Sequence, residues 1–446
     1  MSARDIALPG LAWVLALAAS AGAAAQTASP RFEHTLNDGW RYADGPAPGA
    51  EAPGYDDASW ARVDLPHTWN RSAEGAESPA YRRGVGWYRR ALELDPSLEG
   101  RRLFLRFEGA NQVAEVFVNG HRVGRHVGGY TGFTVDITER VRFDAPNVVA
   151  VRVDNAHDPD IPPLDADFTF YGGIYRDVWL VATNPVHITL TDHGGPGVYV
   201  DAPAVSEEDA TVRVRGTLVN ATDRRRWVQV VSRVLDPGGD EVARMASRLE
   251  LPARGSRAFT QRARPTREPR LWSPAEPNVY TVVTEVGDGG EVTDRIRSPL
   301  GFRWLRVDPD EGVFLNGEPI RLTGTNRHQD RAGYGNALPD AMHVRDIELV
   351  KATGLNFLRL AHYPQDPAVL EATDRLGLVV WEEIPVVNMI TLSDAFGDNA
   401  ERMLREMIRQ HYNHPSVLFW GYMNEIMLVE PDPLPDRYRR RVVELA

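Results

Sequence analysis

The sequence contains no cysteine, so disulfide bonds, thiolate metal sites and a cysteine nucleophile are all excluded. Lysine is nearly absent as well, since Lys351 is the only one among the 50 cationic side chains. Positive charge is the minority sign, because 62 acidic residues give a net charge of -12. Such a surface repels nucleic acid and acidic membranes, so neither is expected as a partner. A neutral or small ligand fits this composition better.

Long apolar runs are also missing, except for one at the N-terminus. Arg4 precedes an apolar stretch at residues 11–19, and small residues then lead to Ala25-Gln26. This pattern predicts a secretory signal peptide over residues 1–25 and a periplasmic or extracellular location. A membrane anchor is the alternative, but the run is shorter than the ~20 residues that a bilayer requires. After cleavage we expect no association with a membrane.

Two stretches of short alternating segments follow the leader. In the first, Leu103, Leu105 and Phe107 share one face, and Asn119-Gly120 is typical of a tight hairpin turn. This stretch predicts a β jelly-roll sandwich over residues 30–184. The second, residues 185–301, has strand patterns at 211–219, 227–235 and 279–286, and predicts a seven-stranded immunoglobulin-like β-sandwich.

After Gly301 the pattern changes to alternating strands and helices. Strands are predicted at 320–325, 357–362, 378–384 and 417–423, with helices at 340–354, 366–377 and around 400–411. Asp366, Pro367 and Gly377 are the residues expected at the ends of the second helix. Residues 302–446 therefore predict the N-terminal half of a (β/α)8 TIM barrel, a fold that needs about 250 residues. We expect the chain to be truncated within that barrel.

Polar side chains follow each predicted barrel strand, where a parallel barrel collects its functional groups. A polar residue in a loop is the ordinary explanation for any one of them, but four successive clusters favour a site. The clusters are Asn326-Arg327-His328-Gln329-Asp330, Arg359 to Tyr363-Pro364, Trp381-Glu382-Glu383 and Asn424-Glu425.

These motifs together resemble glycoside hydrolase family 2, which includes β-galactosidases, β-glucuronidases and β-mannosidases. The matching segments are Gly-Thr-Asn-Arg-His at 324–328, Asn-Phe-Leu-Arg-Leu-Ala-His-Tyr-Pro at 356–364, Asn-His-Pro-Ser-Val at 413–417, Trp-Gly-Tyr-Met-Asn-Glu at 420–425 and the segment 167–176. The resemblance extends over nearly the whole mature chain. It implies the same order of domains: a jelly-roll sugar-binding domain, an immunoglobulin-like domain and the barrel.

The resemblance implies a secreted retaining exo-β-glycosidase that acts on an oligosaccharide or a polysaccharide fragment. Glu425 would be the general acid/base, and we expect the apolar end of its strand to raise its proton affinity by desolvation. Asn424 would donate to a sugar hydroxyl. The remaining substrate-binding residues would be Asp167, His328, His362 and Arg359, with Glu383 and Tyr363 in supporting positions. The nucleophile would lie beyond Ala446, so the 446-residue chain is expected to be inactive.

No catalytic metal and no cofactor are expected. Some β-galactosidases of the family use magnesium held by Glu and His ligands after the third strand, but residues 384–388 here are Ile-Pro-Val-Val-Asn. His411 and His414 are interpreted as structural. The oligomeric state stays undetermined.

Several functions remain open at this stage. Galactosides rank first as substrates, followed by glucuronides and mannosides. A non-catalytic carbohydrate-binding remnant is the alternative from another class. An unrelated barrel, such as an aldolase or a deacetylase, is disfavoured because Lys351 falls within a helix and no His/Asp cluster follows the strands.

Overall fold

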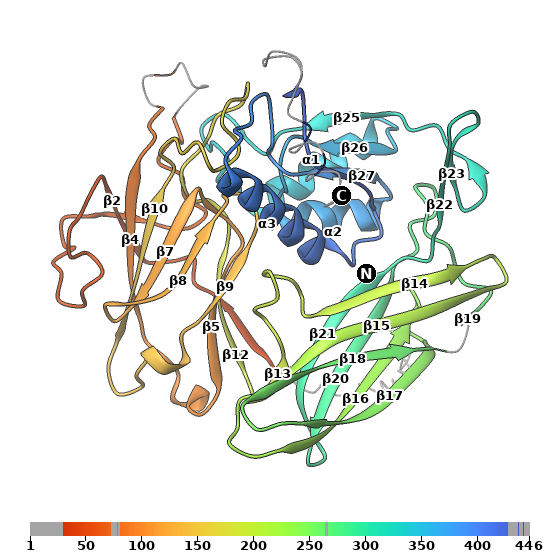
Figure 1. Cartoon of the computed structure of the whole chain (residues 1–446), viewed down its shortest axis with the longest axis horizontal. Helices are drawn as coiled ribbons and strands as arrows, with labels where there is room; N and C mark the ends of the chain where they lie inside the picture. The colour runs from red at the N-terminus through yellow and green to blue at the C-terminus, as the bar shows by residue number, and fades with distance from the viewer. Residues whose placement is uncertain are drawn as a thin grey trace, which may run out of the picture.

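The structure is a computed structural model that describes residues 30–72, 78, 81–263, 266–426, 436 and 440. The predicted signal peptide lies outside the described residues. Figure 1 shows two β-sandwiches beside a smaller unit of parallel strands and helices. The predicted combination of jelly roll, immunoglobulin-like sandwich and partial TIM barrel is confirmed. Within the described residues, no helix is both long enough and apolar enough to cross a membrane.

The first sandwich is built from two antiparallel sheets, with strand orders β1-β12-β5-β9 and β3-β2-β4-β10-β7-β8. Its strands are β1 (Phe32–Thr35), β2 (Trp40–Asp44), β3 (Ala61–Val63), β4 (Val85–Leu92), β5 (Arg102–Phe107), β6 (Ala110–Asn111), β7 (Val113–Val118), β8 (His121–Val127), β9 (Phe133–Asp136), β10 (Asn147–Asp154), β11 (Gly173–Ile174) and β12 (Val178–Thr183). Leu103, Leu105 and Phe107 lie in the core as expected. Asn119 and Gly120 both have positive φ and join β7 to β8, which confirms the predicted hairpin.

The second sandwich has a five-stranded and a four-stranded sheet, so it exceeds the seven strands expected. Its strands are β13 (Val186–Ile188), β14 (Val198–Val205), β15 (Asp209–Asn220), β16 (Arg226–Leu235), β17 (Glu241–Leu251), β18 (Gly255–Arg262), β19 (Thr266–Arg267), β20 (Tyr280–Asp288) and β21 (Glu291–Leu300). The short strand β13 is fully buried and pairs with β15, whereas β19 contributes only two residues at the edge of the sheet. Strands this short give too little alternation for a sequence pattern to reveal them.

A small three-stranded sheet links the second sandwich to the barrel strands, which are parallel and run in the order β25-β26-β27-β28. The elements are β22 (Leu305–Asp308), β23 (Gly312–Leu315), β24 (Glu318–Pro319), β25 (Gly324–Arg327), α1 (Asp340–Ala352), β26 (Phe357–Leu360), α2 (Pro367–Leu376), β27 (Val379–Glu383), α3 (Asp394–His411) and β28 (Val417–Gly421). The first strand begins later than residues 320–325 predicted, because the Ile320 amide donates to Val313 O and keeps Ile320 in the linking sheet.

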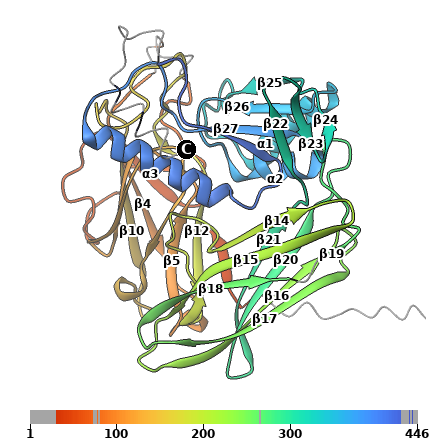
Figure 2. The same ribbon diagram turned by 45° about the vertical axis from the view of Figure 1, so that its right-hand side comes forward.

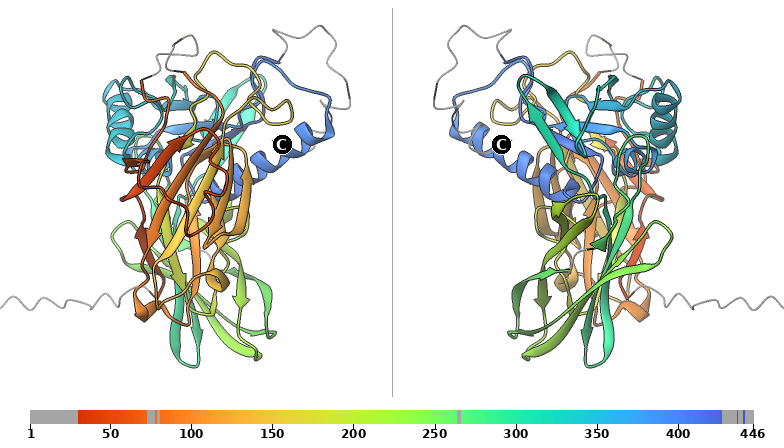
Figure 3. Two further views of the ribbon diagram at one scale, coloured as in Figure 1. Left: turned by 90° about the vertical axis from the view of Figure 1, so that its left-hand side faces the viewer. Right: turned by 90° about the vertical axis from the view of Figure 1, so that its right-hand side faces the viewer.

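Helix α3 lies between the first sandwich and the barrel strands (Figure 2), and the side views show it running obliquely beside the sandwich strands (Figure 3). Its apolar face carries Met403, Leu404 and Met407, which share one buried cluster with Val127 of β8 and Ile384 after β27. The barrel unit and the jelly roll are therefore both packed against the same helix. This packing brings distant parts of the chain to one edge of the barrel sheet.

Candidate active site

The carboxyl ends of β26, β27 and β28 meet at a polar cluster centred on Arg359. The Arg359 Nη2 atom lies 2.9 Å from Glu383 Oε1 and 2.8 Å from Asn424 Oδ1, so one guanidinium bridges three neighbouring strands. Parallel pairing places these three strand ends at the same edge. Sequence reasoning selected all three residues, and the structure brings them together.

Glu383 is the buried anchor of this cluster, with only 1% of its surface exposed. Its carboxylate accepts from Arg359, lies 2.5 Å from His362 Nδ1, and accepts from Trp381 Nε1 at 3.1 Å. A carboxylate with this many donors is held in one orientation. Glu383 therefore orients Arg359 and His362.

Asn424 has a fixed carbonyl and an unused amide group. Its backbone N–H donates to Val386 O at 2.8 Å and its backbone O accepts from Asn388 N at 3.1 Å. The side-chain Oδ1 accepts from Arg359, whereas the buried Nδ2 has no partner among the described residues. A buried donor without an acceptor is costly, so a ligand hydroxyl at this position would be bound favourably.

Glu425 follows Asn424 and is exposed. It adopts a positive φ of 55°, a conformation that non-glycine residues rarely take and that often occurs at functional sites. The side chain is exposed, so the predicted desolvation by the apolar strand end is absent in this structure. The apolar side chains of β28 pack against hydrophobic clusters that do not include Glu425.

Aromatic rings form the wall beside this cluster. Phe168, from the first sandwich, lies 5.4 Å from the His328 ring and 5.1 Å from the Tyr363 ring, measured between centroids. His328 Nδ1 is 3.1 Å from the Tyr363 hydroxyl, and the two imidazoles of His328 and His362 are 5.5 Å apart. The structure thus brings a jelly-roll segment onto the ends of β25 and β26, where sequence reasoning placed the sugar.

Asp167 stands next to Phe168 and is exposed, and no hydrogen bond joins it to the residues that the structure describes. Burial lowers the pKa of His328, and the neighbouring His362 lowers it further. Asp330 and Asp167 act in the opposite direction by attracting a proton to His328. A neutral His328 can both donate and accept, as sugar hydroxyls require.

Sequence reasoning missed the aromatic residues that support this wall. Tyr130 stacks on Tyr363 with 4.4 Å between ring centroids. Trp381 was part of the third strand-end cluster, but its bond to Glu383 was not foreseen. Tyr130 lies in the glycine-rich loop at 128–132 of the jelly roll, and those glycines are the only signal of close packing there. Phe168 belongs to a segment that the sequence did single out, but only for Asp167.

The two histidines interpreted as structural each contact a carboxylate in the core. His411 Nδ1 lies 2.8 Å from Glu382 Oε2, and His414 Nδ1 lies 2.6 Å from Asp374 Oδ2. These pairs fasten α3 to β27 and the start of β28 to α2.

A jelly roll, an immunoglobulin-like sandwich and a parallel barrel sheet with a polar strand-end cluster define the class of multidomain barrel glycosidases. The chain belongs to glycosyl hydrolase family 2. Three profiles of that family match it in succession: the sugar binding domain at residues 34–185, the central family 2 domain at 190–303, and the TIM barrel domain at 307–434.

The chain is similar in sequence to several named proteins of this family. The chain is 42% identical over 381 residues to a β-glucuronidase of Bacteroides fragilis, covering 84% of this chain and 54% of that protein. It is 35% identical over 415 residues to the β-galactosidase BoGH2A of Bacteroides ovatus, covering 90% and 47%. The chain thus spans about half the length of these curated relatives.

Solved structures agree with this placement. Bacteroides uniformis β-glucuronidase 2, covalently bound to cyclophellitol-6-carboxylate aziridine, superposes with a TM-score of 0.88 at 43% identity, covering 93% of this chain and 50% of that one. A variant of the same enzyme, with two aspartates changed to alanine, is described as a calcium binding mutant; it has a TM-score of 0.87 at 42% identity, covering 93% and 50%.

Proposed function

We propose that this chain supplies the glycone-binding and acid/base part of a retaining β-glycosidase whose preferred substrate is a terminal β-glucuronide. The observation that carries the proposal is the Asn424–Glu425 pair beside the Arg359–Glu383 cluster at the barrel edge. Sequence reasoning ranked galactosides first. The names of the relatives support glucuronides instead, and galactosides become the second candidate.

In this function Glu425 gives a proton to the leaving oxygen, and the free amide of Asn424 donates to a neighbouring sugar hydroxyl. A retaining reaction also needs a carboxylate nucleophile about 5 to 5.5 Å from the acid. Glu383 is already bound by three side chains, so we give it the orienting role. We assign the nucleophile to no described residue.

The substrate is tested with a chimera that joins this chain to the second barrel half of the Bacteroides uniformis enzyme. Nitrophenyl β-glucuronide, galactoside and mannoside are compared by kcat/KM. We expect the glucuronide to be hydrolysed most efficiently. A higher kcat/KM for the galactoside would reject the glucuronide preference, and sugar binding by an inactive but folded chimera would favour the binding remnant.

The acid role is tested by Glu425→Gln in the same chimera. Removing a general acid costs about 10² to 10⁴ in rate on alkyl glycosides, whose leaving group needs a proton. The loss should be much smaller on nitrophenyl glycosides, whose leaving group needs none. Glu401→Gln on α3 is the matched control and should leave both rates unchanged. Equal losses on both kinds of substrate would remove Glu425 from the acid role.

We also propose that residues 1–25 direct export and are removed. The support is the pattern of Arg4, an apolar stretch and small residues before Gln26. N-terminal sequencing of the protein secreted by a bacterial host should begin near Gln26, and an intact N-terminus would reject the proposal.

A second proposal concerns a non-catalytic calcium ion near Asp366. Only 2% of Asp366 is exposed, and its carboxylate accepts from Ala368 N at 3.0 Å. Its nearest cationic group, Arg176 Nε, is 3.8 Å from Oδ2, which is beyond hydrogen-bond distance. His343 Nε2 is equally far, but burial lowers the pKa of His343 to about 3, so this ring carries no charge near neutral pH. The charge of this carboxylate is therefore only partly balanced.

The negative charge of Asp366 also affects the pKa values of neighbouring carboxyl groups. Burial raises the pKa of Glu108 to about 8, and the charge of Asp366 adds to the shift. Burial and Asp366 also raise the pKa of Asp340, and Asp177 responds to both aspartates. Oxygen-only donors suit calcium, and a divalent cation would relieve this repulsion. The two aspartates exchanged in the calcium binding mutant are separated by the same number of positions as Asp340 and Asp366.

Within the described ranges, no three His, Asp or Glu side chains converge closely enough to form a metal site alone. Backbone carbonyls and water would complete the coordination, as is usual for calcium. The readout is the melting temperature of the chain in calcium and in a chelator. Calcium at 100 times its Kd should stabilise the fold by about 2.7 kcal/mol.

Asp366→Asn should abolish that response while keeping the helix cap, since asparagine caps as well as aspartate. Asp240→Asn, in a distant turn, serves as the control. A wild-type melting temperature that does not change between calcium and chelator would reject the site.

A further inference from the structure

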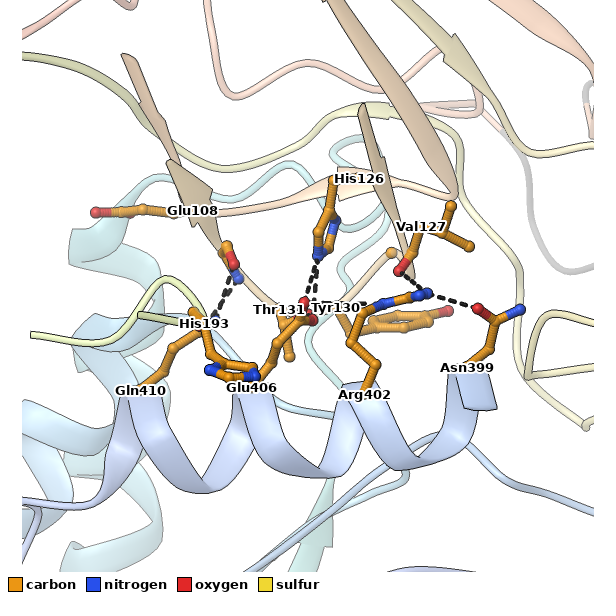
Figure 4. A network of polar contacts seen from close by, with 12 residues as sticks. Glu108, His126, Val127, Tyr130, Thr131, His193, Asn399, Arg402, Glu406 and Gln410 are labelled. Carbon is orange, nitrogen blue, oxygen red and sulfur yellow. Dashed lines mark hydrogen bonds and ion pairs between the residues drawn. The ribbon is translucent and has the colours of Figure 1, made fainter. Parts of the chain in front are cut away.

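The loop Gly128-Gly129-Tyr130-Thr131-Gly132 of the jelly roll joins β8 to β9 and lies on α3 (Figure 4). The Thr131 hydroxyl donates to Glu406 Oε2 at 2.5 Å. His126 Nε2 lies 3.1 Å from both oxygens of the same carboxylate. One glutamate on α3 therefore holds both the end of β8 and the loop that follows it.

Two further side chains of α3 extend this attachment along the same face of the helix. Arg402 Nη2 donates to Val127 O at 2.9 Å, and Gln410 both accepts from Gly132 N at 2.9 Å and donates to Gly132 O at 2.8 Å. Arg402, Glu406 and Gln410 are spaced four residues apart and so form one stripe. Glu406 is the central and most buried of the three, with 5% exposed.

The other side of the loop faces the candidate active site. Tyr175 donates its hydroxyl to Gly129 O at 2.6 Å, and Arg176 donates to Tyr130 O at 3.1 Å, which fixes the backbone on both sides of the tyrosine. The Tyr130 ring then stacks on Tyr363 with an interplanar angle of 18°. Gly129 leaves no room for a larger residue, because an added Cβ would lie 1.9 Å from Asn111 Oδ1.

Tyr363 connects the Tyr130 ring to His328. Its hydroxyl lies 3.1 Å from His328 Nδ1 and accepts from Gln329 N at 3.4 Å. With one ring face covered by Tyr130 and Phe168 at its edge, Tyr363 has little freedom to rotate. The orientation of His328 therefore depends on the position of the jelly-roll loop.

We propose that Glu406 is a positioning residue for the sugar pocket: by holding His126 and Thr131 it fixes the loop, so that Tyr130 packs on Tyr363 and Tyr363 orients His328. This series of contacts runs from α3 through the first domain and back to the edge of the barrel sheet. The proposal rests on the proposed function only in assigning His328 to the sugar; the packing itself is independent of catalysis.

The experiment uses the chain itself, labelled with ¹⁵N-histidine and followed by NMR. The measured quantities are the chemical shifts and the pKa of the His328 imidazole. In Glu406→Ala and in Tyr130→Leu, water should reach His328, so its pKa should rise toward the ordinary value of about 6.5. Glu401→Ala changes the same helix and charge, but the polar partner of Glu401 among the described residues is Arg405, so this variant should leave His328 unchanged.

Conservative variants separate positioning from general destabilisation. Glu406→Gln keeps an acceptor for Thr131 and should retain the wild-type His328 signals. Thr131→Val removes one hydroxyl and should shift them partly, which covers the case in which Glu406→Ala does not fold. The double variant Glu406→Ala/Tyr130→Leu should show no more change than Tyr130→Leu alone, because both act through one contact.

Wild-type His328 signals in a folded Glu406→Ala or Thr131→Val chain would overturn the proposal. Titration with glucuronate tests the dependent claim separately, with a loss of affinity on the order of tenfold expected in Glu406→Ala. Shifted His328 signals with unchanged glucuronate affinity would leave the positioning role in place and remove His328 from the sugar pocket.

Discussion

At the scale of single residues, Asp167 is the sharpest test of the first domain's contribution. It is exposed and bonded to no described residue, so its removal breaks no internal contact. In the active chimera, Asp167→Asn should lower kcat/KM about tenfold, which corresponds to about 1.4 kcal/mol, because the charge that acts on His328 and that we propose to bind the sugar is lost.

Asp165→Asn changes the same charge two positions away and should have little effect on kcat/KM. Melting temperatures of both variants should match that of the unsubstituted chimera. An unchanged kcat/KM in Asp167→Asn would mean that the jelly roll does not complete the pocket.

At the scale of elements, the end of α2 shows how a glycine fixes the contact between two domains. Gly377 ends the helix with a φ of 72°, and an added Cβ would lie 2.7 Å from Pro274 O. Gly354, after α1, has a φ of 83° but open space around it. Gly354→Ala should therefore cost about 1 kcal/mol of unfolding free energy from backbone strain alone.

Gly377→Ala adds the clash with Pro274 to that strain and should cost about 2 kcal/mol or more. Urea denaturation of both variants measures the difference. Equal losses would show that the Pro274 segment moves away without cost.

The same elements show what local sequence can predict. The sequence predicted both ends of α2 correctly from Asp366, Pro367 and Gly377, because capping depends only on neighbouring residues. The first barrel strand was placed too early, because its start depends on whether Ile320 pairs with Val313 or with the barrel. That choice is made by tertiary packing, and no local pattern contains it.

At the scale of the whole molecule, a buried histidine between the two sandwiches makes stability depend on pH. His187 of β13 is 3% exposed and packs edge-on against Phe104 of the jelly roll. Burial lowers its pKa to about 4. Because the unfolded chain binds the proton near pH 6.5 and the folded chain does not, stability is lost as the pH falls from about 6.5 to 4.

The slope from this group approaches 1.4 kcal/mol per pH unit in the middle of that range, about 3 kcal/mol at most in total. His187→Phe should flatten the pH dependence of the unfolding free energy by that amount, whereas His121→Phe at an exposed position should not. A wild-type slope in His187→Phe would assign the acid sensitivity to other groups.

The candidate site could be predicted only in part, because some of its residues are brought together by tertiary packing alone. Arg359, Glu383 and Asn424 follow successive strands, so the barrel pattern places them together. Asp167 and Phe168 reach the same edge only because one domain docks on another, and the family motif was the sole sequence signal for that. Tyr130 and Glu406 had no such motif, since nothing in their local sequence indicates that Tyr130 stacks on Tyr363 or that Glu406 binds Thr131 and His126, which lie 275 and 280 positions away.

The contact between α3 and the jelly roll can form only late in the synthesis of the chain. His126 and Glu406 are 280 positions apart. At a translation rate of about 5 to 20 residues per second, the first domain waits on the order of tens of seconds for the helix that holds its loop. Until α3 has been made, Val127 and the loop beside it lack the helix that covers them in the folded chain, so the first domain can reach its final loop conformation only after residue 411 has been added.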